Sequence, residues 1–231
     1  MTLEVHGLKK TFGTGDAKTD VLKGIDFSAS SGELIILSGA SGSGKSTLLS
    51  ILGGLLSHTD GEVKLDDVDY LDLSEKELTQ MRLSDIGFIF QSSHLIPYMD
   101  IVSQLSFVAE QNGLNKKEAR KRSKALLEEI GLSHRFNSYP GMLSGGERQR
   151  AAIMRALMNK PKMLLADEPT ASLDGARAIE VVEMLRDIVK DRGMIGILIT
   201  HDSCIFEYAD RVLTLEDGHL KAESHTQESQ Q

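Results

Sequence analysis

Cysteine, long apolar runs and basic residues are all scarce in this sequence, and each scarcity excludes a class of protein. Cys204 is the single cysteine among 231 residues, so no internal disulfide can form, which fits a reducing compartment. The longest apolar stretches, such as Met194–Ile199, fall far short of the roughly 18 residues that a membrane-spanning helix needs. The first residues contain no apolar segment typical of a signal peptide. We therefore expect a protein that is neither secreted nor embedded in a membrane.

The charge balance bears on possible partners. The chain has 26 basic and 34 acidic residues, which gives a net charge of −8. Proteins that coat nucleic acid are normally basic, so we expect no nucleic-acid partner. Residues 116–122 form a local basic stretch. On an acidic chain this stretch is more typical of the solvated face of a helix than of a nucleic-acid or lipid patch.

Hydrophobic periodicity predicts an α/β protein. Short strands are predicted at Leu3–His6, Glu33–Ser38, Glu62–Leu65, Ile86–Phe90, Met163–Ala166 and Ile195–Thr200, with a hairpin over Arg211–Leu215 and His219–Ala222. Helices are predicted at Ser46–Leu56, Lys116–Ile130 and Arg177–Arg192. We expect one domain with an α/β core (1–91 and 162–222), a helical insert (about 92–161) and a disordered tail (about 223–231).

A phosphate-binding pattern lies between the second predicted strand and the first predicted helix. Residues 39–46 read Gly-Ala-Ser-Gly-Ser-Gly-Lys-Ser, a complete G-x-x-x-x-G-K-S. Glycines let backbone N–H groups surround a phosphate, and the following helix N-terminus adds positive potential. Lys45 is predicted to contact the β- and γ-phosphates and Ser46 to ligate Mg²⁺. A flexible turn that binds nothing would not explain the full pattern in this context.

Two carboxylates end a later strand. Asp167 and Glu168 directly follow the apolar run Met163–Ala166. Open α/β sheets bind their ligands at the carboxyl ends of strands. Asp167 is therefore predicted to hold Mg²⁺, and Glu168 to orient or deprotonate the water that attacks the γ-phosphate. A solvated turn before Pro169 is the alternative, and the phosphate loop makes it the weaker one.

A third motif narrows the choice among the families that share a phosphate loop. Residues 143–149 read Leu-Ser-Gly-Gly-Glu-Arg-Gln, about twenty residues before the acidic pair. Kinases, GTPases and many ATPases share a phosphate loop, but this segment in this order is far more specific. The chain resembles the ATP-binding subunits of ABC transporters over essentially its whole length. The resemblance implies a RecA-like P-loop nucleotide-binding domain with an N-terminal antiparallel β-subdomain and an inserted α-helical subdomain.

The resemblance also assigns roles to individual residues. It implies catalytic roles for Glu168, His201, Lys45 and Gln91, and Mg²⁺ contacts from Ser46, Gln91 and Asp167. Ser172 to Asp174 resemble the D-loop of the family, and Phe12 stands where the family more often has a tyrosine that stacks on adenine. The residues implied to bind ATP are Phe12, Gly39, Ser41, Gly42, Gly44, Lys45, Ser46, Thr47, Gln91, Ser144, Gly145, Gly146 and Asp174.

Taken singly, several of these residues have ordinary structural explanations. Gln91 could be any polar loop residue, His201 a structural histidine and Phe12 a core side chain. Ser144 could simply cap a helix. Their occurrence together, in the order of the family, favours the functional interpretation.

The resemblance further implies how the chain assembles. Family members bind two ATP molecules between two copies arranged head to tail, so each phosphate loop faces the signature segment of the other copy.

The sequence around the motifs resembles the MacB-type branch of the family, in which a separate ATPase works with an FtsX-like permease. Within that branch it resembles the ATPases of haem efflux. The implied location is the cytoplasmic face of the membrane. Haem is expected to bind the permease, because the seven histidines are scattered and no C-x-x-C-H occurs.

Other functions stay open at this point. The cargo could be an antimicrobial peptide, a macrolide or a lipoprotein. A soluble ABC-type ATPase acting on nucleic acid or the ribosome is less consistent, because the chain has one phosphate loop and no long heptad insert between Lys45 and Ser144. A P-loop kinase of a small metabolite would leave the signature segment unexplained.

Overall fold

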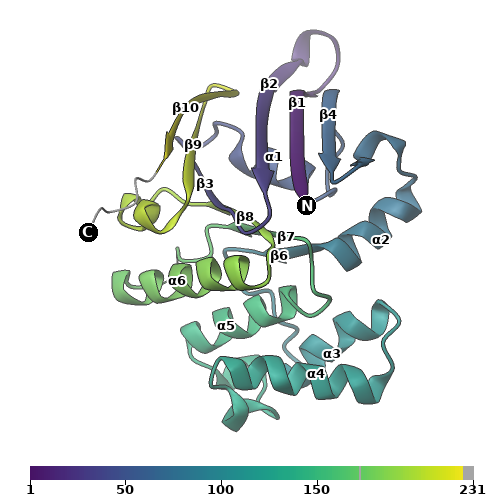
Figure 1. Ribbon diagram of the computed structural model, residues 1–231, viewed down its shortest axis with the longest axis vertical. Coiled ribbons are helices and arrows are strands. Elements are labelled where there is room, and N and C mark those ends of the chain that lie inside the picture. Colours follow the sequence, from purple (N-terminus) through teal and green to yellow (C-terminus); the bar gives the residue numbers. More distant parts are fainter. Residues whose placement is uncertain (172, 226–231) are drawn as a thin grey trace.

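The chain folds around two β-sheets, as the computed structural model shows for residues 1–171 and 173–225 (Figure 1). One sheet is antiparallel with strand order β2-β1-β4-β5. The other has the order β10-β9-β3-β8-β7-β6, and all its strand pairs are parallel except β10 with β9. The strands are β1 (Thr2–Phe12), β2 (Thr19–Ser30), β3 (Leu34–Ser38), β4 (Asp60–Leu65), β5 (Val68–Asp69), β6 (Ile86–Ile89), β7 (Met163–Asp167), β8 (Ile195–Ile199), β9 (Arg211–Glu216) and β10 (His219–His225).

Helices cover the larger sheet and form most of the segment between β6 and β7 (Figure 1). In the described part of the chain, none of them is long and apolar enough to span a bilayer. They are α1 (Lys45–Leu52), α2 (Glu75–Asp85), α3 (Ile101–Gln111), α4 (Lys116–Glu129), α5 (Gly145–Ala156) and α6 (Gly175–Asp191).

The six-stranded sheet separates two hydrophobic cores. In β3, Leu34 and Ile36 belong to one cluster, whereas Ile35 and Leu37 belong to the other. Successive side chains of a strand point to opposite faces, so an uninterrupted apolar strand contributes to both. The first core joins the sheet to α3, α4, α5 and α6, and the second fills the space between the two sheets around α1. Both cores fix β3, β7 and β8, whose carboxyl ends carry the predicted site.

The predicted architecture is confirmed, with corrections at particular elements. Strand β2 was not predicted, although Ile25, Phe27 and Ala29 alternate with polar residues and are buried. Helix α2 was not predicted because Met81 is its single buried residue, which leaves no apolar stripe to detect. Residues 223–225, expected in a disordered tail, pair with β9 as part of β10. Residues 226–231 of that tail are not among those the structure describes.

Candidate functional site

The phosphate loop connects β3 to α1, and its glycines are required by its shape. Gly39, Gly42 and Gly44 have φ values of 140°, 80° and 106°, a region that L side chains rarely adopt. A Cβ on Gly39 would also lie 2.1 Å from the carbonyl oxygen of Leu215 in β9. The loop therefore has this conformation only because glycine stands at these positions.

Lys45 is already turned into the loop. Its Nζ donates hydrogen bonds of 2.8 Å to the carbonyl oxygens of Gly39 and Ala40, and its side chain is buried. These bonds hold a positive charge within the curve of the loop. A phosphate entering there would meet an ammonium group that the fold has already desolvated and positioned.

The phosphate loop lines a cleft of about 430 Å³ at the carboxyl ends of the central strands. That size suits a small-molecule site. Val21 of β2 and Ile199 of β8 also line the cleft, and neither was predicted from the sequence. The predicted residues found in the lining are Gly39, Ser41, Gly42, Gly44, Lys45, Ser46, Thr47, Glu168 and His201.

Glu168 and His201 meet at one wall of this cleft. They follow β7 and β8, which are adjacent parallel strands, so their side chains emerge at the same edge of the sheet. His201 Nδ1 lies 3.2 Å from Glu168 Oε1. Glu168 has a φ of 46°, a conformation unusual for this residue type, and its N–H donates to the Ile199 carbonyl at 3.0 Å. The backbone thus holds a carboxylate toward the cleft, where it can accept a proton from water.

Asp167 lies deeper, beside the phosphate loop. Burial raises the pKa of its carboxyl and the charge of Glu168 raises it further, whereas a polar contact from the Ser46 hydroxyl and the charge of Lys45 lower it. A bound cation would favour the ionised carboxylate. One hydroxyl and one carboxylate are oxygen ligands of the kind that Mg²⁺ accepts when phosphates and waters complete its shell. No group of three or more His, Cys, Asp or Glu side chains that could hold a metal occurs among the described residues, so phosphate oxygens would be needed.

Besides Asp167 and the signature residues Ser144, Gly145 and Gly146, three more predicted site residues lie outside the lining of this cleft. Gln91 follows β6 and is exposed. Phe12 ends β1 with 41% of its surface exposed, and the Lys10 ammonium lies 4.9 Å from its ring centre. Asp174 caps α6 and accepts a 3.1 Å hydrogen bond from the Arg177 N–H. Their contacts with nucleotide stay predictions, and Ser172 of the D-loop is not described by the structure.

The signature segment forms a rigid helix start. Ser144 Oγ accepts a 3.2 Å hydrogen bond from the Glu147 N–H, and Glu147 Oε2 accepts one of 2.7 Å from the Ser144 N–H, which makes a capping box. Arg135 Nε donates to Glu147 Oε1 at 2.9 Å. The Ser144 N–H bond and then the Arg135 bond lower the pKa of Glu147 to about 2. Glu147 was not predicted as a site residue, although the spacing Ser-x-x-Glu was its signal.

The glycines that follow Ser144 are not required by the fold of a single chain. A Cβ on Gly145 or Gly146 would meet no heavy atom closer than 4.0 or 3.7 Å, and neither has a positive φ. Their N–H groups open α5, where a helix favours anions. Ser144 and Gly146 border a separate hollow of about 190 Å³ with Leu173 of the loop before α6, and no signature residue lines the phosphate-loop cleft. The phosphate loop and the signature segment therefore line two spatially distinct cavities of the chain.

Comparison with known sequences identifies relatives of this arrangement. A family model described as ABC transporter matches residues 22–171. A Staphylococcus haemolyticus protein that carries the name hemin import ATP-binding protein HrtA is 58% identical over 221 residues, which cover 96% of this chain and 100% of that protein. A Staphylococcus aureus protein of the same name is 56% identical over 220 residues, 95% of this chain and 99% of that protein.

Solved structures give the same fold. The dimeric ATP-binding cassette MJ0796, in a post-hydrolysis state bound to ADP and Pi, matches with a TM-score of 0.88 and 33% identity, over 98% of this chain and 99% of that one. The protein cbiO1 from Clostridium perfringens, described as part of the ABC transporter complex cbiONQ, matches with a TM-score of 0.87 and 32% identity, over 97% and 88% of the two chains.

Proposed function

The chain belongs to the ABC transporter family, and from this premise we propose that it is the subunit whose ATP hydrolysis drives a separate FtsX-like permease for haem. That it is an ATPase follows from the family. The observation that carries the mechanism is the separation of the phosphate-loop cleft from the hollow at the signature segment, because each would supply half of an ATP site and a second copy would be needed to surround ATP.

We assign the chemical roles as follows. The phosphate loop and Lys45 bind the β- and γ-phosphates. Ser46 and Asp167, with Gln91, would hold Mg²⁺, which offsets phosphate charge when it is bound. Glu168 accepts a proton from the attacking water, and His201, 3.2 Å away, fixes that carboxylate and approaches the γ-phosphate. Phe12 and Asp174 would complete the nucleotide contacts from the rim.

The second half of each site comes from another copy of the chain. Cassettes of this family act as dimers, as in the MJ0796 structure. The free N–H groups of Gly145 and Gly146 and the hydroxyl of Ser144 suit a terminal phosphate presented by the other copy. Glycine also lets that phosphate approach the backbone closely, which explains glycines that the single chain does not need. ATP then holds the two copies together, and its hydrolysis releases them.

A groove at the edge of the sheet suits the permease. It has a volume of about 200 Å³ and lies between β6 and the helices α3 and α5. Phe90 lines one wall of the groove, and the next residue is Gln91, which is predicted to contact the nucleotide. A segment bound in the groove would therefore contact a residue adjacent to the nucleotide site. Tyr98, a few residues further along the chain, is 82% exposed and is available to contact a permease. Leu95 is buried in the core and is not available for such a contact. We propose that a cytoplasmic segment of an FtsX-like, HrtB-type permease docks here, which places the chain at the cytoplasmic face of the membrane.

Haem as the cargo is supported by the similarity to the HrtA proteins. The name of these relatives states import, whereas the resemblance of this sequence to the MacB-type branch implies export. We propose efflux, with haem bound by the permease and not by this chain. Deletion of the gene should make cells sensitive to haem and raise their haem content. Lower haem uptake would favour import, and an altered tolerance only to peptides or macrolides would indicate another cargo.

The partner is tested by purification from membranes with a tagged Glu168→Gln chain in ATP and Mg²⁺. Because Glu168 serves water and not nucleotide, the variant should accumulate in the ATP-bound, permease-bound state. Recovery of a permease in equal amounts supports the proposal. Recovery of ribosomes or nucleic acid without a permease would replace it with the soluble ATPase function.

A further inference from the structure

Helix α4 carries its charges in the order opposite to the one that a helix dipole favours. Acidic side chains stabilise a helix N-terminus and basic ones its C-terminus. In α4, Glu128 and Glu129 occupy the last turn, and Glu118 is the one carboxylate among residues 116–124. The same nine residues contain six cations: Lys116, Lys117, Arg120, Lys121, Arg122 and Lys124. The helix dipole therefore does not account for the order of charges along α4.

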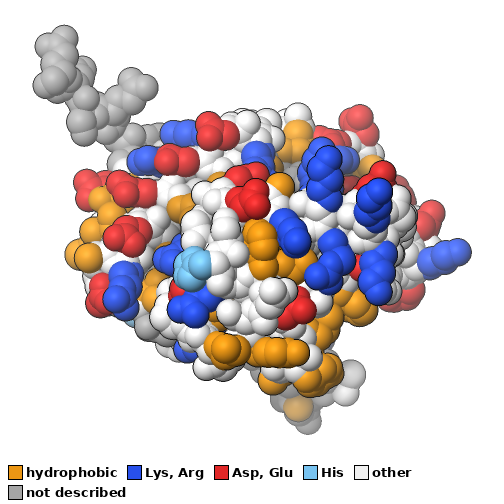
Figure 2. Space-filling view, turned by 90° about the horizontal axis from the view of Figure 1, so that it is seen from below, with side chains coloured by type: hydrophobic (Ala, Val, Ile, Leu, Met, Phe, Trp, Pro, Cys, Tyr) orange, Lys and Arg blue, Asp and Glu red, His pale blue; other side chains and the backbone are white. Residues whose placement is uncertain are grey.

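The same cations lack the acidic partners that several other cations in the described part of the chain have, although Lys124 lies over the ring of Phe136. None of the six forms an ion pair with any residue that the structure describes, whereas Lys9 pairs with Asp60 at 2.9 Å and Lys221 with Glu216 at 2.7 Å. Glu118 is held by the side chain of Asn115, which caps α4. The buried face of α4 consists of small and apolar residues, so the cations stand on its outer side. Figure 2 shows a group of Lys and Arg side chains close together on the right half of the face seen from below, whereas on the left half basic and acidic side chains are interspersed.

The cationic end of α4 comes directly after the hairpin loop that joins it to α3, a helix that forms part of one wall of the proposed permease groove. Helix α3, which precedes α4 in a hairpin, contributes Val108 to the lining of that groove. The hairpin loop is held against α2, because Asn112 Oδ1 accepts a 2.9 Å hydrogen bond from Gln80. Helix α4 begins four residues after Asn112. A permease segment in the groove would therefore bring the surrounding bilayer toward the first two turns of α4.

We propose that Lys116, Lys117, Arg120 and Lys121 form a docking surface for the anionic lipid headgroups of the inner leaflet. The inference rests on the proposed function, which brings the chain to a permease. The negative cytoplasmic leaflet attracts Lys and Arg within a few ångströms of its surface. The acidic remainder of the chain does not cancel this attraction, because at physiological salt charges are screened over about 8 Å. A nucleic acid long enough to cover the surface would also run along acidic parts of the chain, whereas a bilayer touches one edge.

Vesicle sedimentation with the full chain tests the docking surface. Vesicles of phosphatidylglycerol and phosphatidylcholine in equal parts should bind the wild-type chain at 0.1 M salt, and pure phosphatidylcholine vesicles should not. The variant replaces the docking surface by K116Q, K117Q, R120Q and K121Q. The control removes the same charge from paired cations by K9Q, K64Q, K190Q and K221Q. Each lost cation that contacts the membrane should weaken binding about fivefold, so the loss of all four should weaken it by up to about 600-fold, and by at least about tenfold if only two make contact, while the control stays within about twofold.

Three results would overturn the inference: no binding to anionic vesicles, equal binding by the wild type and the variant, or tighter capture of duplex RNA than of vesicles at the same salt. Circular dichroism establishes that the variant is folded. ATP hydrolysis, measured on the same preparations, separates this inference from the proposed function. Full hydrolysis without lipid binding refutes the docking surface alone, whereas absence of hydrolysis by the wild type refutes the proposed function.

Discussion

Glu147→Gln removes the charge that holds the start of α5 in place while it preserves the shape of the capping box. Glutamine can still accept a hydrogen bond from the Ser144 N–H, as in other capping boxes. It cannot pair with the Arg135 guanidinium, which lies 2.9 Å from the carboxylate. It also cannot place a negative charge at the helix N-terminus. The substitution therefore measures what the electrostatic part of this clamp contributes to folding.

The structure gives the size of that contribution. A pKa lowered from 4.5 to about 2 corresponds to an upper limit of about 3 kcal/mol in favour of the folded, ionised state. Arg135 is one-third exposed and Glu147 is 12% exposed, so solvent screening reduces the expected loss to about 1–2 kcal/mol at pH 7. Because the folded pKa lies below the ordinary one, this stabilisation is complete above about pH 4.5. It disappears as the pH falls from there toward 2.

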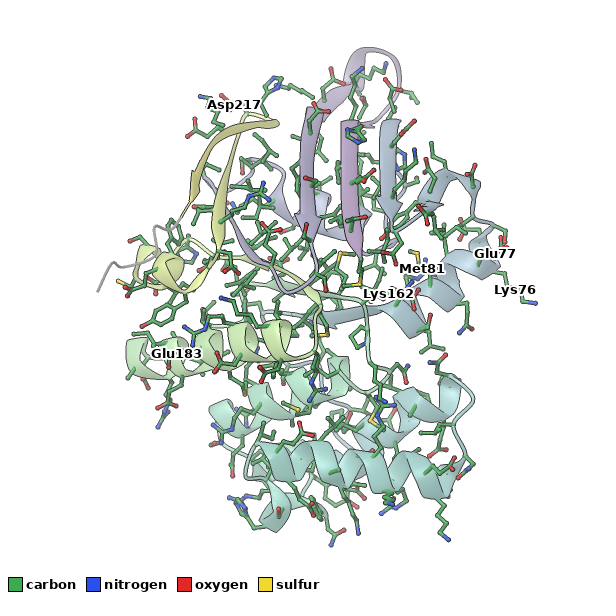
Figure 3. All side chains as sticks on the ribbon, in the orientation of Figure 1. Lys76, Glu77, Met81, Lys162, Glu183 and Asp217 are labelled. Atoms are coloured by element: carbon green, nitrogen blue, oxygen red, sulfur yellow. The ribbon has the colours of Figure 1, made fainter. Side chains whose placement is uncertain are left out.

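Urea unfolding followed by circular dichroism at pH 7 and at pH 3 provides the measurement. The wild type should exceed Glu147→Gln by about 1–2 kcal/mol at pH 7 and by clearly less at pH 3. Glu77→Gln is the matched control, because Ser74 and Glu77 form the same capping box on α2 without an arginine. Glu77 lies at the exposed start of that helix (Figure 3). Equal stability of Glu147→Gln and the wild type at pH 7, or a difference that does not change with pH, would refute the electrostatic account.

Three further outcomes follow from the nucleotide cleft. Lys45→Ala should weaken ATP binding about 10- to 100-fold in titration calorimetry, because a charge-assisted bond to phosphate is lost; an unchanged Kd would contradict the assignment. Gly39→Ala should lower the free energy of unfolding by about 2–4 kcal/mol, since its Cβ would lie 2.1 Å from the Leu215 carbonyl, and wild-type stability would refute that contact. Glu168→Gln should bind ATP normally but hydrolyse it about 100-fold or more slowly, and near-normal turnover would exclude Glu168 as the base.

The parts of the site that were predictable are those encoded by contiguous residues. The phosphate loop needs glycines with positive φ and a lysine at fixed spacing, and both requirements are local. Asp167 and Glu168 were recognisable because a fully apolar strand precedes them. The meeting of Glu168 with His201 depends on the order of β7 and β8 in the sheet, which spacing alone does not provide. The resemblance to ABC transporters supplied that long-range information.

Helix α2 and the end of strand β10 were missed for a related physical reason. Helix α2 is held by the capping box of Ser74 and Glu77 and by one buried methionine, so hydrophobic periodicity had nothing to detect. Strand β10 extends to His225 through backbone pairing with β9, although its last residues are polar. Gln91 and Phe12 lie outside the lining of the cleft formed by the single chain, and their predicted contacts depend on a bound nucleotide. Hydrophobic patterns in a sequence predict buried faces well, but they predict helix capping and strand pairing much less well.

The central claim is that each ATP is bound between opposite copies of the chain, and complementation between two inactive variants tests it most directly. Lys45→Ala removes a phosphate loop, and Ser144→Arg removes a signature half-site. In a mixed dimer one site loses both halves, and the other retains an intact phosphate loop and an intact signature segment.

Each variant alone should hydrolyse almost no ATP. If sites are shared, an equal mixture should recover about one quarter of wild-type hydrolysis, since half of the dimers would be mixed and each would have one intact site of two. A mixture as inactive as its components would contradict the shared site. Normal hydrolysis by Ser144→Arg alone would do so as well.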